Sequence, residues 1–158
     1  MRFSCNSKKN VIRKMSVTIL QSKSLSRGVV SDLNALYAEM RVSFYKQPTM
    51  WQWRRVLGQK NVRFFVVRES NRVVGMVSFY WRELPAGKVG MVEDMVVSSQ
   101  HRGKGHGSAL TKAVIDFAKK QRLAYIDLTT RPDRVAANKL YQKFGWKRRK
   151  TNVYRLLL

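Results

Sequence analysis

The sequence is short of the residues that would crosslink the chain or carry it through a membrane. Its 158 residues include one cysteine, so the chain can form neither an intramolecular disulfide nor a zinc site built from several cysteines. No apolar run approaches the roughly 18 residues of a membrane-spanning helix, because the longest, 73–81, is interrupted by Gly75 and Ser78. The length and the ordinary apolar content predict one soluble domain with a single core.

Acidic residues are also scarce. Nine Asp and Glu face 32 Lys and Arg, which gives a formal net charge of +23. The excess lies at the two ends, since residues 1–31 contain no acid and residues 100–158 contain three. Such a charge favours a polyanionic partner, which can be nucleic acid, an anionic membrane or a phosphate-rich ligand. A merely soluble, basic surface is an equally open interpretation.

Residues 1–15 are basic, free of acid and without periodicity, so we expect an N-terminal extension outside a domain of residues 16–158. This extension is interpreted as disordered, as a leader or as a transit-type presequence, and Met15 is an alternative start to Met1. Without a secretory signal, the expected location is the cytoplasm, or an organelle matrix or stroma if the extension is a presequence.

The first half of the domain predicts two helices and three strands. A strand is expected over 17–20, a helix from an N-cap at Ser31-Asp32, and a second helix from Thr49 to Gly58. Strand-like runs at 62–68 and 72–81 are separated by the polar turn at 69–71, which predicts a hairpin.

The second half alternates strands and helices. We expect a strand over 88–97, a helix after a glycine-rich segment, a strand over 124–130 and a helix around 137–144. Runs at 146–150 and 153–157 are expected to close the chain as strands. The whole order predicts a single α/β domain with a mixed sheet.

The segment 92–110, VEDMVVSSQHRGKGHGSAL, passes from a strand through a glycine-rich loop into a helix. Such a loop directs main-chain N–H groups at one point, and the helix adds its positive end, so the expected ligand is a phosphate or pyrophosphate. The segment is not a P-loop, because Gly107 is followed by Ser-Ala, and it lacks the third glycine of a dinucleotide fingerprint, because position 108 is Ser.

The run Gln100-His101-Arg102-Gly103-Lys104-Gly105 resembles the acetyl-CoA loop of the GNAT superfamily of N-acetyltransferases, Q/R-x-x-G-x-G/A. The stretch 93–97, EDMVV, resembles the family's fourth strand, and 137–146, ANKLYQKFGW, is similar to its ending AxxLYxKxGF. The resemblance covers roughly residues 17–158. It implies a mixed sheet flanked by helices on both faces, acetyl-CoA as co-substrate, and no metal.

The resemblance also implies which residues hold the donor. The pyrophosphate would be held by main-chain groups of the loop residues Arg102, Gly103, Lys104, Gly105, His106, Gly107 and Ser108. The pantetheine arm would lie along Met95, Val96 and Val97, with an N–H of Val97 or a neighbour directed at the thioester carbonyl. Many members carry Asn seven residues before the motif's Tyr, whereas this chain has Arg134, which either reaches a phosphate or is a solvated charge.

Two residues are candidates for proton transfer. The resemblance makes Tyr141 the general acid that protonates the departing thiolate, although a core aromatic is the structural alternative. Glu93 is the candidate base, acting directly or through water, with an exposed or ion-paired carboxylate as its alternative. Asp94 is less favoured, because strand alternation places it on the opposite face.

The acceptor is predicted less sharply. Trp51, Phe79 and Trp81 form either an aromatic wall of the acceptor cleft or part of the core. The net positive charge favours a neutral or anionic amine, from a small molecule or from a protein; association with a ribosome or nucleic acid rests on charge alone. The resulting hypothesis is an N-acetyltransferase working by direct attack through a tetrahedral intermediate. The alternative is a basic nucleic-acid-binding protein on the same scaffold without transfer activity, and a longer acyl donor also remains open.

Overall fold

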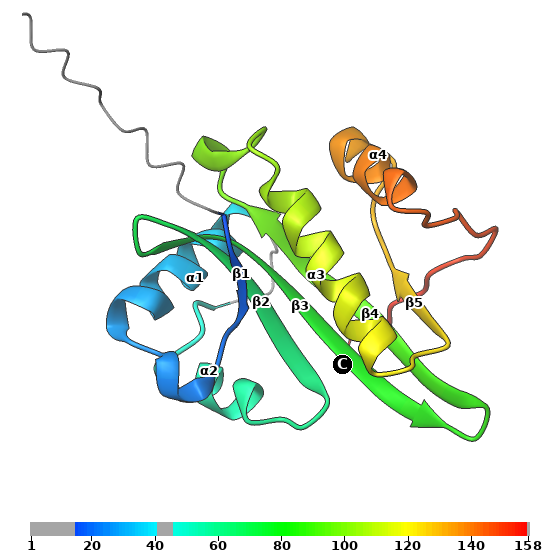
Figure 1. Cartoon of the computed structure of the whole chain (residues 1–158), viewed down its shortest axis with the longest axis horizontal. Coiled ribbons are helices and arrows are strands. Elements are labelled where there is room, and N and C mark those ends of the chain that lie inside the picture. The colour runs from blue at the N-terminus through cyan, green and yellow to red at the C-terminus, as the bar shows by residue number, and fades with distance from the viewer. Residues whose placement is uncertain (1–14, 41–45, 158) are drawn as a thin grey trace, which may run out of the picture.

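The computed structural model describes residues 15–40 and 46–157 and contains one sheet with strand order β1-β2-β3-β4-β5 (Figure 1). The strands are β1 (Val17–Ile19), β2 (Val62–Glu69), β3 (Arg72–Leu84), β4 (Gly87–Val97) and β5 (Tyr125–Leu128). The first four pair antiparallel, and β5 pairs parallel to β4. The predicted mixed sheet is therefore confirmed, whereas the predicted extension falls almost wholly on residues 1–14, outside the described residues.

Helices cover both faces of this sheet. They are α1 (Arg27–Glu39), α2 (Met50–Leu57), α3 (His106–Lys120) and α4 (Val135–Lys143), with short 3₁₀ turns η1 (Ser22–Ser24) and η2 (Ser99–His101). One core layer joins α1 and α2 to the sheet through residues such as Leu33, Trp53 and Met76. The other joins α3 to the opposite face around Phe79 and Leu110.

The start of α1 differs from the prediction. The helix begins at Arg27 because Ser26, in an extended conformation, accepts a hydrogen bond from the Val29 N–H at 3.2 Å. Asp32, expected near the N-cap, lies inside the helix and is buried, where it accepts the Val73 N–H at 2.9 Å and pairs with Arg72. The predicted N-cap was wrong because Asp32 connects α1 to β3 instead.

The tight hairpin between β2 and β3 is confirmed. Ser70 and Asn71 both have positive φ, 46° and 66°, as a two-residue type I′ turn requires. The ladder resumes directly with Glu69 opposite Arg72. This turn brings Glu69 to the edge of the molecule that also carries the glycine-rich loop.

Strand β4 is irregular at the position that matters for function. Met76 lies opposite Val96, but Ser78 lies opposite Glu93, so β4 has one more residue than β3 in this interval and forms a bulge. Asp94 in the bulge has φ 49°. On the other side, pairing with β5 ends at Val92 opposite Leu128, so residues 93–97 have no strand beside them there.

The two strands predicted at the end of the chain are wrong, since residues 146–157 contain no strand. Four successive charged residues at 147–150 offer no apolar face to bury, and residues 153–157 are exposed. Trp146 does fix the start of this segment, because its indole N–H donates to the Ile126 carbonyl at 3.3 Å. None of the helices in the described ranges is both long and apolar enough to cross a membrane.

Candidate functional site

The glycine-rich loop leads into α3 without a side-chain cap. Gly103 and Gly105 have φ 78° and 83°, a conformation that side chains with a Cβ disfavour. Gly105 is the N-cap of α3, and no described side chain accepts from the first turn of this helix. The first helical bond runs from the Ala109 N–H to the Gly105 carbonyl at 3.0 Å, so the preceding N–H groups have no partner within the helix. Such an end suits an anion.

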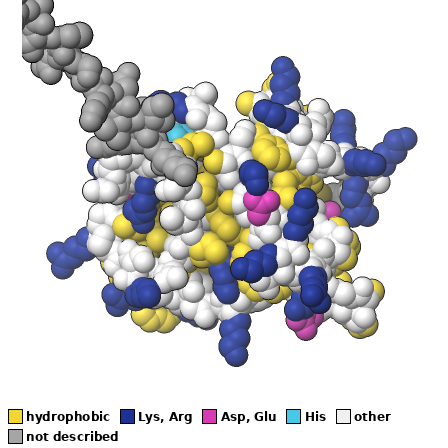
Figure 2. Space-filling view, in the orientation of Figure 1, with side chains coloured by type: hydrophobic (Ala, Val, Ile, Leu, Met, Phe, Trp, Pro, Cys, Tyr) yellow, Lys and Arg dark blue, Asp and Glu magenta, His cyan; other side chains and the backbone are white. Residues whose placement is uncertain are grey.

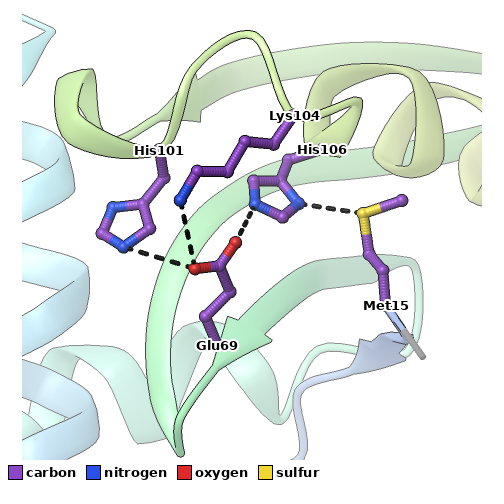
Figure 3. Close-up of polar contacts among 5 residues, drawn as sticks. All are labelled: Met15, Glu69, His101, Lys104 and His106. Atoms are coloured by element: carbon purple, nitrogen blue, oxygen red, sulfur yellow. Dashed lines mark hydrogen bonds and ion pairs between the residues drawn. The ribbon is translucent and has the colours of Figure 1, made fainter. Parts of the chain in front are cut away.

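The cationic side chains of the loop point to carboxylates (Figure 3). Lys104 Nζ lies 3.5 Å from Glu69 Oε2, and His106 Nε2 lies 2.6 Å from Glu69 Oε1. Arg102 donates to the Val97 carbonyl at 3.1 Å and to the Glu39 carboxylate at 3.3 Å. The carboxylates thus hold these side chains beside the loop, and the main-chain N–H groups of the loop are left available to a ligand.

Sequence reasoning missed both carboxylates. Glu39 ends α1 and also accepts the Ser99 N–H at 2.8 Å, and Glu69 ends β2. They lie at least 32 positions from the loop residues that they contact. No motif in the sequence links them to the loop.

The unpaired edge of β4 lies next to this loop. The Val96 side chain is buried in the α1 layer, while those of Met95 and Val97 pack in the α3 layer. On the side of β5, the main chain of 95–97 has no strand to pair with. Thr130, two residues beyond β5, has a buried hydroxyl with no hydrogen-bond partner among the described residues. An unpaired strand edge and an unused hydroxyl fit a ligand arm that carries amide groups, as pantetheine does.

The two β4 carboxylates lie on one face, contrary to the alternation expected for Asp94. Asp94 Oδ2 accepts the Tyr37 hydroxyl at 2.7 Å and the Ser78 hydroxyl at 3.2 Å. Ser78 is the register partner of Glu93, so the bulge brings both acidic residues to the α1 face. Burial raises the pKa of Glu93, the Asp94 charge raises it further, and Arg155 opposes both effects.

Tyr141 lies on α4 and is buried. Burial raises the pKa of its phenol, Arg134 lowers it and Glu93 raises it. The Tyr141 ring meets that of Trp146 edge-on, with centroids 5.8 Å apart. Tyr141, Arg134 and Glu93 are therefore close enough to interact electrostatically, and the phenol is protonated at neutral pH.

Arg134 occupies the N-cap position of α4. Beside it, the Asn138 amide donates to the carbonyls of Arg131 and Arg134 at 2.9 and 3.0 Å. The Asn138 side chain therefore holds the loop before α4 together. Arg134, at the end of this loop, is close enough to Tyr141 to lower the pKa of its phenol.

The three aromatic residues predicted for the acceptor wall do not form one surface, because Trp51 lies apart from Phe79 and Trp81. Trp51 is 65% exposed on α2, with the Arg55 guanidinium 5.5 Å from its ring centroid. Phe79 has no exposed surface and packs against Phe117 of α3, so it belongs to the core and its prediction as a cleft residue was wrong. Trp81 stacks on Phe79 on that same α3 face.

Metal ligands do not cluster in the part of the chain that the structure describes, where no group of three or more His, Cys, Asp or Glu is arranged to hold an ion. The polar groups described above are the main-chain N–H groups of the loop, the β4 carboxylates and the Tyr141 phenol.

A comparison with known protein families shows which family the chain belongs to. The sequence profile of the Acetyltransferase (GNAT) family matches residues 30–146, from within α1 to the third residue after α4. The chain belongs to the GNAT family of acetyltransferases. The glycine-rich loop and the Tyr141 motif both lie inside the matched range.

Curated relatives of this GNAT protein are acetyltransferases of greater length. N-acetyltransferase 8B of Rattus norvegicus is 33% identical over 100 residues, which are 62% of this chain and 44% of that protein. Mycothiol acetyltransferase of Renibacterium salmoninarum is 37% identical over 87 residues, which are 52% of this chain and 25% of that protein. The chain therefore spans less than half the length of these relatives.

Solved structures confirm the GNAT fold. An aminoglycoside acetyltransferase from an uncultured soil metagenomic sample superposes with a TM-score of 0.79 at 18% identity, over 91% of this chain and 97% of that one. A ribosomal-protein-alanine N-acetyltransferase from Brucella melitensis gives a TM-score of 0.71 at 21% identity, over 91% of this chain and 99% of that one. At these identities the likeness shows the fold alone.

Proposed function

We propose that this GNAT protein is an acetyl-CoA-dependent N-acetyltransferase that acylates a primary amine. The observation that carries the proposal is the juxtaposition of two main-chain features at one edge of the sheet. The N-terminus of α3 has no side-chain cap, and β4 loses its neighbour after Val92. A diphosphate joined to an extended amide-bearing arm is the ligand that matches both.

In this proposal the donor is held mainly by main-chain groups. The N–H groups at residues 103–108 bind the pyrophosphate, and residues 95–97 pair with the pantetheine arm as an added strand would. An N–H at Val97 or a neighbour then faces the thioester carbonyl, where it stabilises the negative charge that develops on oxygen. Arg134 and the Thr130 hydroxyl are further candidates for contacts with the donor.

The transfer needs one base and one acid. The amine nitrogen attacks the acetyl carbonyl, a C–N bond forms, and the C–S bond breaks as the tetrahedral intermediate collapses. Glu93, whose raised pKa makes it a stronger base, accepts the amine proton directly or through water. Tyr141, which keeps its proton at neutral pH, donates that proton to the departing thiolate.

The acceptor class remains broad. The similar proteins include a mycothiol acetyltransferase, an aminoglycoside acetyltransferase and a ribosomal-protein-alanine N-acetyltransferase. We retain a small-molecule amine or a protein amine as acceptor, with the exposed Trp51 as a contact. None of the comparisons favours the alternative of a nucleic-acid-binding protein without transfer activity.

The test combines donor binding with turnover. Acetyl-CoA is titrated calorimetrically into the wild type and a Gly105→Glu variant, and CoA release is followed over a panel of amines. The matched control is Gly87→Glu, because Gly87 also has positive φ and open space around it but is the first residue of β4, directly after the β3–β4 turn. We expect 1:1 binding and turnover in the wild type and the control, and loss of both in Gly105→Glu. Equal binding by all three proteins would contradict the proposed donor site.

A further inference from the structure

One carboxylate outside the proposed reaction centre gathers the polar side chains of the glycine-rich loop. Glu69, at the end of β2, accepts from His106 through Oε1 at 2.6 Å, while Lys104 and His101 approach Oε2 at 3.5 and 3.6 Å (Figure 3). Its register neighbour Arg72 is paired with Asp32 instead. Glu69 is therefore directed at the loop and not at the adjacent strand.

These three contacts hold a segment whose two glycines would otherwise leave its backbone free to adopt many conformations. Lys104 lies between Gly103 and Gly105, and glycine loses the most conformational freedom when a chain becomes ordered. Lys104 and His106 flank Gly105, so one carboxylate holds the residues on both sides of the glycine that caps α3. The second ring nitrogen of His106 lies 2.9 Å from Met15 Sδ, which fixes the ring on its other side.

Glu69 carries its negative charge at neutral pH. The His106 hydrogen bond holds the pKa of the Glu69 carboxyl below its usual range, burial opposes this effect, and Lys104 adds to the lowering. Glu39 anchors the start of the same loop through Ser99 and Arg102. The loop is thus attached at both ends to acidic residues from distant elements.

We propose that Glu69 is a positioning residue for the donor, which acts through His106 and Lys104 to hold the loop in the conformation that presents its N–H groups to the pyrophosphate. This role rests on the proposed function. It makes donor affinity depend on a residue that does not itself contact the donor, because an ordered loop pays less entropy on binding. In this role Lys104 and His106 hold the loop in position through Glu69 and do not contact the phosphates directly.

The experiment compares a ligand that has the pyrophosphate with one that lacks it. Calorimetry measures CoA binding, and ligand-observed NMR measures S-acetylpantetheine binding, for the wild type, Glu69→Gln and Glu83→Gln. Glu83 is the matched control because it is an exposed carboxylate paired with Lys88 at 2.8 Å, remote from the loop. In Glu69→Gln we expect CoA affinity to fall about tenfold and S-acetylpantetheine affinity to stay unchanged. Glu83→Gln should alter neither.

A double variant tests the route of the effect. If Glu69 acts through His106, Glu69→Gln combined with His106→Gln weakens CoA binding no more than the stronger single variant, because contacting residues are non-additive. If the losses of CoA affinity in the two single variants add up in the double variant, or if Glu69→Gln keeps its CoA affinity, the positioning role of Glu69 is overturned while the proposed function stands. Loss of both ligands in Glu69→Gln would also overturn it, by showing general unfolding. Failure of the wild type to bind CoA would remove the proposed function as well.

Discussion

At the scale of single residues, Asp94 connects local backbone geometry to acid–base chemistry. Its φ of 49° is uncommon for a residue other than glycine, and hydrogen bonds from Tyr37 and Ser78 hold its carboxylate in this position. A fixed negative charge next to Glu93 makes proton uptake there more favourable. Asp94 therefore adjusts the candidate base without having to touch the substrate.

Replacing Asp94 tests this coupling through the pH dependence of the reaction. The Asp94 charge raises the pKa of Glu93, so Asp94→Asn lowers that pKa, and Glu93 becomes ionised at lower pH. We expect the acid-side inflection of kcat/KM to move to lower pH. Asp116→Asn, at an exposed site on α3, is the control and should leave the profile in place. An inflection that stays fixed in Asp94→Asn would exclude Glu93 as the titrating base.

Tyr141→Phe removes the candidate acid and keeps the ring that packs against Trp146. We expect kcat to fall about 10²- to 10⁴-fold, since a positioned acid typically contributes this much. Acetyl-CoA affinity should remain near that of the wild type, because the phenol acts on the leaving group and not on the pyrophosphate. A variant with full kcat and normal stability would show Tyr141 to be a core aromatic, the alternative that its sequence position left open.

The site residues that the sequence predicted are those that lie close together along the chain. The loop glycines and Tyr141 lie within short motifs, so their grouping could be read along the chain. Glu39 and Glu69 reach the loop only because α1 and β2 end beside it, and no local pattern records that. Phe79 was ambiguous because an aromatic residue on a strand looks the same whether it lines a cleft or fills a core.

At the scale of elements, β4 packs so closely on its α3 side that one position has no room for a side chain. A Cβ on Gly90 would lie 2.6 Å from Phe79 Cζ and 2.7 Å from Leu123 Cδ2. Phe79 is itself fully buried against Phe117 and cannot withdraw freely. The absence of a side chain at Gly90 thus makes room for the Phe79 ring and the Leu123 side chain above β4.

Gly90→Ala should reduce the free energy of unfolding by about 2 kcal/mol, a typical cost of overpacking a core. Gly28→Ala is the matched control, because its Cβ would meet only Ser26 Oγ at 3.8 Å within α1. Alanine's higher helix propensity should raise the free energy of unfolding there by up to about 1 kcal/mol. Urea denaturation measures both, and a Gly90→Ala protein as stable as the wild type would contradict the tight packing.

The elements that were predicted well have both a periodic pattern and a clear boundary. Helix α2 begins after Thr49 and ends before Gly58, as expected, and the structure adds a capping box between Thr49 and Gln52. The strands predicted over 146–150 and 153–157 had no such pattern, since four successive charged residues stand at 147–150, and strand pairing depends on residues elsewhere in the chain. The β4 bulge was likewise invisible, since it is a difference in register between two strands.

At the scale of the whole molecule, the large positive charge is not confined to the glycine-rich loop. Lys and Arg side chains are spread around the face shown in Figure 2, with few acidic residues among them. Several cations of the glycine-rich loop are already paired with Glu39 and Glu69. The overall charge therefore attracts phosphates toward the protein without determining where a donor binds.

Salt separates these two effects. Between about 50 and 500 mM KCl we expect acetyl-CoA affinity to fall less than about tenfold, because main-chain N–H groups in a fixed geometry bind the pyrophosphate. Binding of an RNA homopolymer, which measures diffuse attraction, should fall at least about a hundredfold over that range. Calorimetry and a filter-binding assay follow the two ligands. Parallel losses would mean that acetyl-CoA is attracted only by the cationic surface.

The short pairing between β4 and β5, which ends at Val92 opposite Leu128, also has a mechanical consequence. The segment from β5 through α4 is joined to the rest of the sheet by fewer ladder bonds than any interior strand, and this segment carries Tyr141. A bound pantetheine arm would supply hydrogen bonds that the polypeptide omits. The substrate would then serve as a structural member of the protein, and each release of CoA would leave the wall that holds the phenol less firmly attached to the sheet.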